Sequence, residues 1–202
     1  MRRSRVLKAV GQLLLCTAAA GMTFGCVRKS DRNEEEERGK IMIEDVQVKH
    51  VRVKTEKSFG EVAAALEARM GRFDQAVYEQ PRSGDAPEAV RARLEGMVGP
   101  SGFLLFRTSD HGALLRLVGQ KKKAVQYLVG NPLFAIQMTQ HDVRAGLYAP
   151  LRVLLYENED GKTCVEYDKP SSQFGQFGNA SVTEVATMLD RKLEQLVAEA
   201  TR

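Results

Sequence analysis

The segment LRVLLYENEDGKTCVEYD (151–168) decides the fold of this chain. Its two halves, 151–157 and 162–168, are rich in Val, Leu and Tyr and are typical of β-strands, while NEDG between them is typical of a hairpin turn. Strands that are joined by a hairpin, in a chain whose helices lie elsewhere, are characteristic of an α+β domain.

Three more strands are predicted upstream of the hairpin. Residues 50–55 (HVRVKT) alternate between apolar and polar side chains, and 103–108 (FLLFRT) and 124–130 (AVQYLVG) are short apolar runs. Together with the hairpin they give about five strands. The predicted fold is a compact two-layer α+β domain, in which helices pack on one face of an antiparallel or mixed sheet.

The first and last helices are predicted from capping residues and helical spacing. Ser58 and Glu61 form a capping box, and Ser181 and Glu184 form a second one near the end of the chain. Each box precedes an apolar stripe that marks a buried helix face. The stripes consist of Phe59, Val62, Leu66, Met70 and Phe73 in the first helix and of Val185, Leu189, Leu193, Leu196 and Ala200 in the last.

Shorter helices are expected between these two. A loop at 80–88 precedes a helix with Asp85 as its candidate cap and Pro87 in its first turn. Further short helices are predicted within 109–119 and over 132–146, the latter with Pro132 in its first turn.

Residues 1–25 have the layout of a secretory signal peptide. A basic start, MRRSRVLK, precedes an apolar stretch at 9–24. That stretch is shorter than the roughly 18 apolar residues that a membrane-spanning helix needs. We therefore expect the protein to be exported.

Two cleavage sites compete. TFGC (23–26) is similar to the lipobox of bacterial lipoproteins, which would place a lipid on Cys26, while AAA (18–20) suits an ordinary signal peptidase cutting after Ala20. In the second case Cys26 keeps a free thiol, and a disulfide with Cys164 could form in an oxidising compartment.

Residues 26–45 are interpreted as the anchor cysteine and a charged tether. The part at 27–45 is polar and lacks periodicity, and as a flexible chain it would reach about 25 Å. The folded domain is expected over 46–202. The expected location is the periplasmic side of the bacterial cell envelope, with the protein anchored to a membrane through Cys26, or soluble in the periplasm as the alternative.

The net charge argues against a nucleic-acid partner. The chain has 30 basic and 26 acidic residues, and Arg2, Arg3, Arg5 and Lys8 in the leader account for the difference. A chain that is neutral after export lacks the basic surface that phosphate binding requires.

Three segments resemble a known family. RTSDHGALLRLVG (107–119), VGNP (129–132) and APLRVLLYENEDGKTCVEYDKP (149–170) are together similar to domain-of-unknown-function family 302. The resemblance covers roughly 46–200 and implies a compact α+β domain that is often dimeric, with no established activity. Relative to the family pattern, residues from about 73 to 102 are interpreted as an insertion.

Asn131 raises the first functional question. It lies between the strand at 124–130 and the helix that starts at Pro132, so its side chain is suited to capping that helix. The alternative is that Asn131 and the free N–H groups of the helix bind an anion.

Four other residues complete the set of ligand-binding candidates. Asp110 and His111 are the best charged pair, although Asp110 is also suited to capping a short helix, and Tyr167 and Asp168 end a hairpin strand. The three histidines, His50, His111 and His141, show no metal-ligand spacing, so no metal and no cofactor are predicted. Cys164 is expected to pack as a small apolar residue.

No catalytic residues are assigned, and a role without catalysis is favoured while an enzymatic one is left open. The favoured hypothesis is an envelope module that binds a small ligand or a protein. The alternatives are an enzyme with a site near Asp110, His111 and Asn131, and a purely structural domain that forms a homodimer. Replacing His111 and Asn131 separates these hypotheses.

Overall fold

The structure is a computed structural model that describes residues 41–79 and 86–202. The chain divides into two units, Met1–Glu44 and Asp45–Arg202. In the first unit, the described residues 41–44 have no regular secondary structure, and Ile41, Met42 and Ile43 are exposed. None of the helices in the described ranges is long and apolar enough to cross a membrane.

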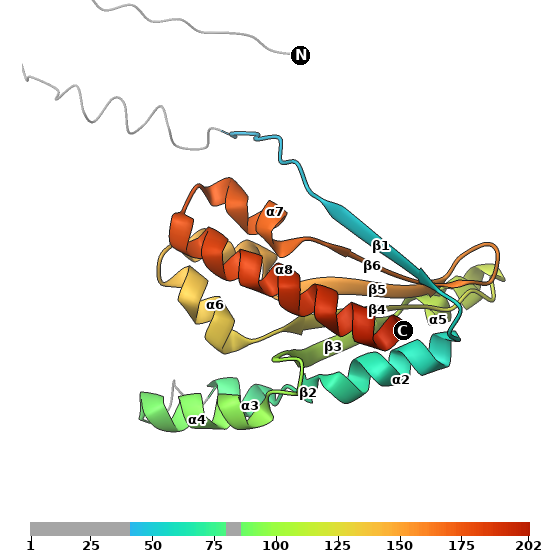
Figure 1. The fold of residues 1–202 in the computed structure, drawn as a ribbon, viewed down its shortest axis with the longest axis horizontal. Coiled ribbons are helices and arrows are strands. Elements are labelled where there is room, and N and C mark those ends of the chain that lie inside the picture. Colours follow the sequence, from blue (N-terminus) through green and yellow to red (C-terminus); the bar gives the residue numbers. More distant parts are fainter. Residues whose placement is uncertain (1–40, 80–85) are drawn as a thin grey trace, which may run out of the picture. The chain divides into compact units, whose positions relative to one another are not determined.

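The second unit is built on a six-stranded sheet in the order β1-β6-β5-β4-β3-β2 (Figure 1). Its neighbouring strands are antiparallel except for β2, which is parallel to β3, so the sheet is mixed. The strands are β1 (His50–Thr55), β2 (Gly71–Arg72), β3 (Leu104–Asp110), β4 (Ala124–Gly130), β5 (Leu151–Glu157) and β6 (Thr163–Asp168).

The two long helices at the ends of the domain, α2 and α8, lie across one face of this sheet (Figure 1). This arrangement confirms the predicted two-layer α+β fold. The helices are α2 (Phe59–Arg69), α3 (Gln75–Glu79), α4 (Pro87–Met97), α5 (His111–Leu115), α6 (Pro132–Thr139), α7 (Pro170–Phe174) and α8 (Ala180–Thr201), with the 3-10 turns η2 (Arg116–Val118), η3 (Val143–Tyr148) and η4 (Gly175–Phe177).

The hydrophobic core lies between the sheet and these two helices. Alternate residues of the central strands point to the helical side, because successive side chains of a strand face opposite ways. Burying one such side chain stabilises the fold by about 1.5–3 kcal/mol relative to leaving it exposed. The fully buried side chains include Tyr127, Val129, Val153, Leu155 and Val165 from the sheet, and Val62, Leu66, Leu193 and Leu196 from the helices.

Several local predictions are confirmed and others are wrong. The capping box of Ser58 and Glu61 is present at the start of α2. The prediction of a second capping box at Ser181 and Glu184 is wrong, because α8 already begins at Ala180. Its cap is Asn179, which accepts a hydrogen bond from the N–H of Val182. The predicted cap Asp85 lies outside the described residues, and the N-cap position of α4 is Ala86, which makes no side-chain capping bond.

The helix expected over 132–146 is two elements, since α6 ends at Thr139 and the separate turn η3 begins at Val143. The first helix, α2, is also shorter than the stripe from Phe59 to Phe73 predicted. That helix ends at Arg69, and Phe73 follows β2 and packs its ring on Phe106 with centroids 4.3 Å apart.

Two glycines bring β2 against the end of α4. A Cβ atom added to Gly71 would lie 1.7 Å from the carbonyl oxygen of Met97, and one added to Gly99 would lie 2.3 Å from the backbone nitrogen of Gly71. Side chains at these two positions are therefore excluded. The close approach places α4 beside the end of the sheet where β4 meets α6.

Candidate functional site

The side-chain amide of Asn131 forms hydrogen bonds through both its oxygen and its nitrogen. Its Oδ1 atom accepts a hydrogen bond of 2.8 Å from the N–H of Leu133, which caps α6. Its Nδ2 group donates to the carbonyl oxygen of Gly102 at 3.0 Å, and the residue is 8% exposed. The predicted capping role is therefore present in the structure, and one of the two Nδ2 hydrogens is engaged by the carbonyl of Gly102.

A cavity of about 640 Å³ lies beside this corner, and we call it the α4–α6 cavity. Its walls come from α4, β3, α6, β5 and α7, and its lining is mainly apolar. Residues that line it include Leu94, Phe106, Ile136, Met138, Leu151 and Phe174.

The polar side chains Gln75, Asn131 and Thr139 also line the α4–α6 cavity. Thr139 donates its hydroxyl proton to the carbonyl oxygen of Ala135 at 2.9 Å, and Asn131 makes the two hydrogen bonds described above. The other lining side chains are apolar. The arrangement suits a ligand that is recognised by shape and by the burial of apolar surface.

Asp110 and His111 lie at the opposite end of the sheet. Asp110 is paired with Val125 at the start of β4, whereas Gly130 at the end of β4 is paired with Leu104. With about 3.3 Å of rise per strand residue, the two ends of β4 are roughly 20 Å apart. The structure therefore does not bring Asp110 and His111 together with Asn131.

The local roles of this pair are simple. Asp110 caps α5 by accepting a hydrogen bond of 2.8 Å from the N–H of Ala113, and His111 is an exposed residue of the first turn.

Tyr167 is 4% exposed on the core face of β6, and burial raises its pKa to about 12. It therefore stays protonated near neutral pH and cannot serve as a base.

Asp168 belongs to a charged network on the other face of the sheet. Its Oδ1 atom lies 2.8 Å from Nδ1 of His50, and Nε2 of His50 lies 3.0 Å from Oε2 of Glu166. Glu166 also accepts hydrogen bonds from Tyr156, at 2.6 Å, and from Arg52. The network therefore joins the edge strand β1 to its neighbour β6 and, through Tyr156, to β5.

Charges in this network are stabilised by one another. Burial acts to raise the pKa of Glu166, but hydrogen bonds from Tyr156, Arg52 and His50 hold it below its ordinary value. The hydrogen bonds to Asp168 and Glu166 raise the pKa of His50. No group of three or more potential metal ligands is present among the described residues.

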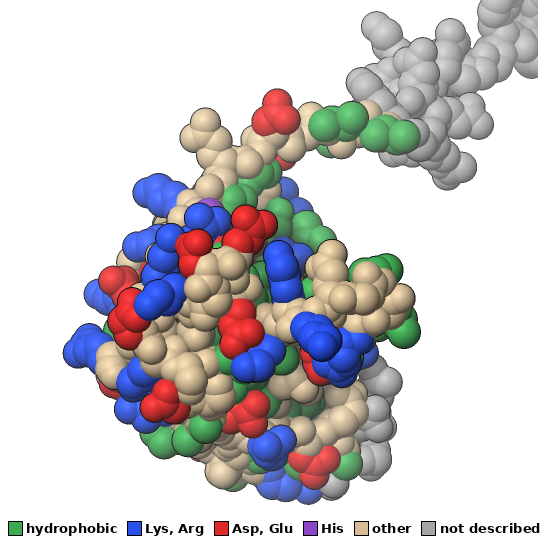
Figure 2. All heavy atoms as spheres, turned by 90° about the vertical axis from the view of Figure 1, so that its right-hand side faces the viewer, with side chains coloured by type: hydrophobic (Ala, Val, Ile, Leu, Met, Phe, Trp, Pro, Cys, Tyr) green, Lys and Arg blue, Asp and Glu red, His purple; other side chains and the backbone are tan. Residues whose placement is uncertain are grey.

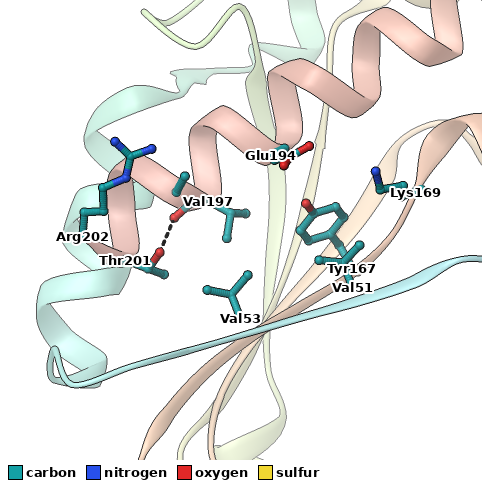
Figure 3. Close-up of a pocket in the computed structure, with 9 residues that line it drawn as sticks. Val51, Val53, Tyr167, Lys169, Glu194, Val197, Thr201 and Arg202 are labelled. Carbon is teal, nitrogen blue, oxygen red and sulfur yellow. Dashed lines mark hydrogen bonds between the residues drawn. The ribbon is translucent and has the colours of Figure 1, made fainter.

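A second, smaller cavity of about 270 Å³ lies between β1 and α8, and we call it the β1–α8 cavity. Figure 3 shows Val51 and Val53 of β1 facing Val197 and Thr201 of α8, with Tyr167 beside them. The hydroxyl of Thr201 donates to the carbonyl oxygen of Val197. This cavity is less than half the size of the α4–α6 cavity.

The family model described as domain of unknown function DUF302 matches residues 79–200. The chain belongs to the DUF302 family. The match confirms the resemblance to this family over the matched residues, which contain Asp110, His111, Asn131, Tyr167 and Asp168.

Among solved structures, the DUF302 domain is similar to one titled as the crystal structure of uncharacterized conserved protein DUF302 from Bacillus stearothermophilus. The TM-score is 0.54 at 17% identity, over 76% of this chain and 98% of that chain. At this identity the likeness concerns the fold alone. No curated protein matches the chain.

The sequence did not point to the cavity or to His50. The one available signal for the cavity was the run PLFAI (132–136), which is apolar on every side of the predicted helix. His50 was treated as one of three scattered histidines, because its pairing with Asp168 spans 118 residues. Cys164 is a buried free thiol, in agreement with its predicted packing role.

Replacing Asn131 and replacing His111 should affect the stability of the DUF302 domain to different extents. Asn131→Ala should lower the free energy of unfolding by about 1–2 kcal/mol, because α6 loses its cap and the carbonyl of Gly102 loses a partner. His111→Ala should change it by less than about 0.5 kcal/mol, because the side chain is exposed. Urea unfolding of both variants measures the difference, and equal effects would contradict this assignment.

The network at His50 predicts a pH dependence of stability. Since the pKa of His50 is raised in the folded state, its contribution is complete below the unfolded value of about 6.5 and is lost as the pH rises through the folded pKa. His50→Gln should lower the urea midpoint at about pH 5 more than at about pH 9. His141→Gln is the matched control at an exposed histidine. A loss that is the same at both pH values would show that the imidazolium contributes nothing.

Proposed function

We propose that this DUF302 domain binds an apolar small molecule in the α4–α6 cavity, as part of an exported protein anchored to the membrane by a lipid on Cys26. The observation that carries the binding role is the cavity itself. Its volume of about 640 Å³ falls within the roughly 300–1,000 Å³ of typical ligand sites, and its lining is mainly apolar.

The composition of the lining supports an apolar ligand class. Most of the residues that line the cavity have apolar side chains, so most polar groups of a ligand would be left without a partner there. A buried polar group without a partner costs about 1–3 kcal/mol. Apolar surface, by contrast, gains about 25 cal/mol for each Å² removed from water. A hydrocarbon chain or a largely apolar ring system is therefore the favoured ligand.

Binding is favoured over catalysis by the placement of the polar candidates. An enzyme site built from Asp110, His111 and Asn131 would need all three within reach of one substrate. They lie at opposite ends of β4, and Asp110 and Asn131 each cap a helix. A purely structural role gives no reason for an apolar cavity of this size. The homodimer expected from the family resemblance stays a prediction.

Support for export and anchoring comes from the sequence. The basic and apolar leader is followed by TFGC at 23–26 and then by the charged segment 27–45. This order gives the periplasmic side of the bacterial envelope as the proposed location. A soluble periplasmic protein, cut after Ala20, is the alternative.

Filling the cavity tests the binding role. Ala135 lines the α4–α6 cavity and Ala198 lines the β1–α8 cavity, so Ala135→Leu and Ala198→Leu make the same change at two sites. We expect a polyene fatty acid, whose fluorescence rises in an apolar site, to bind the unchanged chain and the Ala198→Leu variant. Ala135→Leu should weaken that binding at least about tenfold, which corresponds to about 1.4 kcal/mol. Binding that survives Ala135→Leu, or no binding to the unchanged chain, would refute this function.

The anchor is tested by labelling cells with an alkyne-bearing fatty acid. The unchanged chain should incorporate the label and partition with membranes, and Cys26→Ser should abolish both, because a thiol is required for attachment of the lipid. Cys16→Ser is the control within the leader. An unlabelled chain in the soluble periplasmic fraction would support cleavage after Ala20.

A further inference from the structure

Three large apolar side chains are exposed together on α6 and η3. Ile136 is 46% exposed, Val143 81% and Leu147 74%. The two elements pack against each other, so these residues form one region, which we call the α6–η3 surface. Single exposed apolar residues are ordinary, whereas a group of this kind marks an interaction site.

The α6–η3 surface is continuous with the α4–α6 cavity. Ile136 belongs to both, and Gly146, which lies between Val143 and Leu147 in η3, also lines the cavity. A Cβ atom added to Gly146 would meet no atom within 4 Å, so the space beside it is open. The charged side chains that flank Val143, Asp142 and Arg144, form an ion pair with each other at 2.7 Å between Oδ2 and a guanidinium nitrogen. The path from this surface into the cavity passes the apolar residues Ile136 and Leu147 and the open space at Gly146.

The chain enters the folded domain at the same end of the sheet. β1 begins at His50, which is paired with Asp168 at the end of β6. β6 is antiparallel to β5, and the first residue of β5, Leu151, is paired with Val129 at the end of β4. The predicted tether thus joins the domain at the end where Asn131 and the α4–α6 cavity lie.

We infer that the α6–η3 surface docks on the lipid bilayer to which the tether holds the domain, and that the ligand of the cavity is an acyl chain drawn from that bilayer. This inference rests on the proposed function. A tether of this length would hold the start of the domain on the order of 25 Å from the membrane, and the effective concentration of the α6–η3 surface at the bilayer would be in the millimolar range. Even a weak apolar contact is then populated, with the apolar side chains inserting at the boundary of headgroups and acyl chains.

The opposite end of the sheet offers an internal comparison. Leu114, Leu117 and Val118 on α5 and η2 are also exposed, at 61%, 83% and 72%. They lie far from the cavity and from the start of β1. Lysines form ion pairs with acidic residues there: Nζ of Lys122 lies 3.9 Å from Oε1 of Glu159, and Nζ of Lys123 lies 2.9 Å from Oε1 of Glu157. Figure 2, which faces this end, shows Lys and Arg side chains interspersed with Asp and Glu.

Single tryptophans test the inference cleanly, because the chain contains no tryptophan. Leu147→Trp and Val118→Trp place one reporter at each end, at positions whose exposure leaves room for the larger side chain. The chain from residue 26 to 202 is coupled through Cys26 to a maleimide lipid in phosphatidylcholine vesicles. Cys164 is fully buried and does not compete for the coupling. This coupling supplies the anchor whether or not cells attach a lipid.

We expect the emission of Leu147→Trp to shift to the blue on these vesicles and to be quenched by brominated acyl chains, while Val118→Trp stays as in water. In the chain without tryptophan, Val143→Ser with Leu147→Ser should slow the transfer of the polyene fatty acid from vesicles to the protein at least about tenfold. The affinity for the same fatty acid added from solution should be retained.

Three results would overturn the inference. Leu147→Trp could stay unshifted on vesicles, both reporters could shift equally, or the shift could appear without vesicles and grow with protein concentration, which would identify a second copy as the occupant. If fatty acid from solution still binds in any of these cases, the proposed function stands and only the docking role fails. Loss of that binding in the unchanged chain would instead remove the proposed function.

Discussion

The region around the cavity depends on two hydrogen bonds made by one buried amide, the side chain of Asn131. One bond caps α6 and the other reaches the carbonyl of Gly102, just before β3. The junction of β4 and α6 is thereby fixed to the entry to β3, which lies 29 residues earlier in the chain. The residue is a structural corner, and the corner is what gives the cavity a defined wall.

An apolar cavity beside a well-packed core has an energetic meaning of its own. The α4–α6 cavity is open beside Gly146, so its apolar lining is accessible from the surface. The same DUF302 domain packs Tyr127, Leu155 and Leu193 with almost no exposure. An apolar molecule in the α4–α6 cavity would remove lining surface from water and add contacts to it. Ligand binding and stability are coupled in this view.

The sequence predicted those parts of the fold that depend on neighbours along the chain. The hairpin of β5 and β6, the alternation of β1 and the capping box of Ser58 all follow from local patterns. β2 was missed because two residues carry no periodicity, and α7 because PSSQF has the composition of a loop. Ser181 was preferred to Asn179 as a cap because Glu184 completed the box pattern, although an Asn two residues earlier caps a helix as well.

The candidate site was harder to predict, because its signal is tertiary. Polar residues such as Asp110 and His111 are the ones that sequence reasoning selects as candidates, yet the cavity is lined mainly by apolar residues that resemble any others in the core.

The location of the cavity relative to the predicted tether follows from the topology of the sheet alone. β1, β6, β5 and β4 are successive antiparallel neighbours, so the start of β1 and the end of β4 must fall at the same end of the sheet. Any anchor attached ahead of β1 therefore acts on the end that carries Asn131, α6 and the cavity.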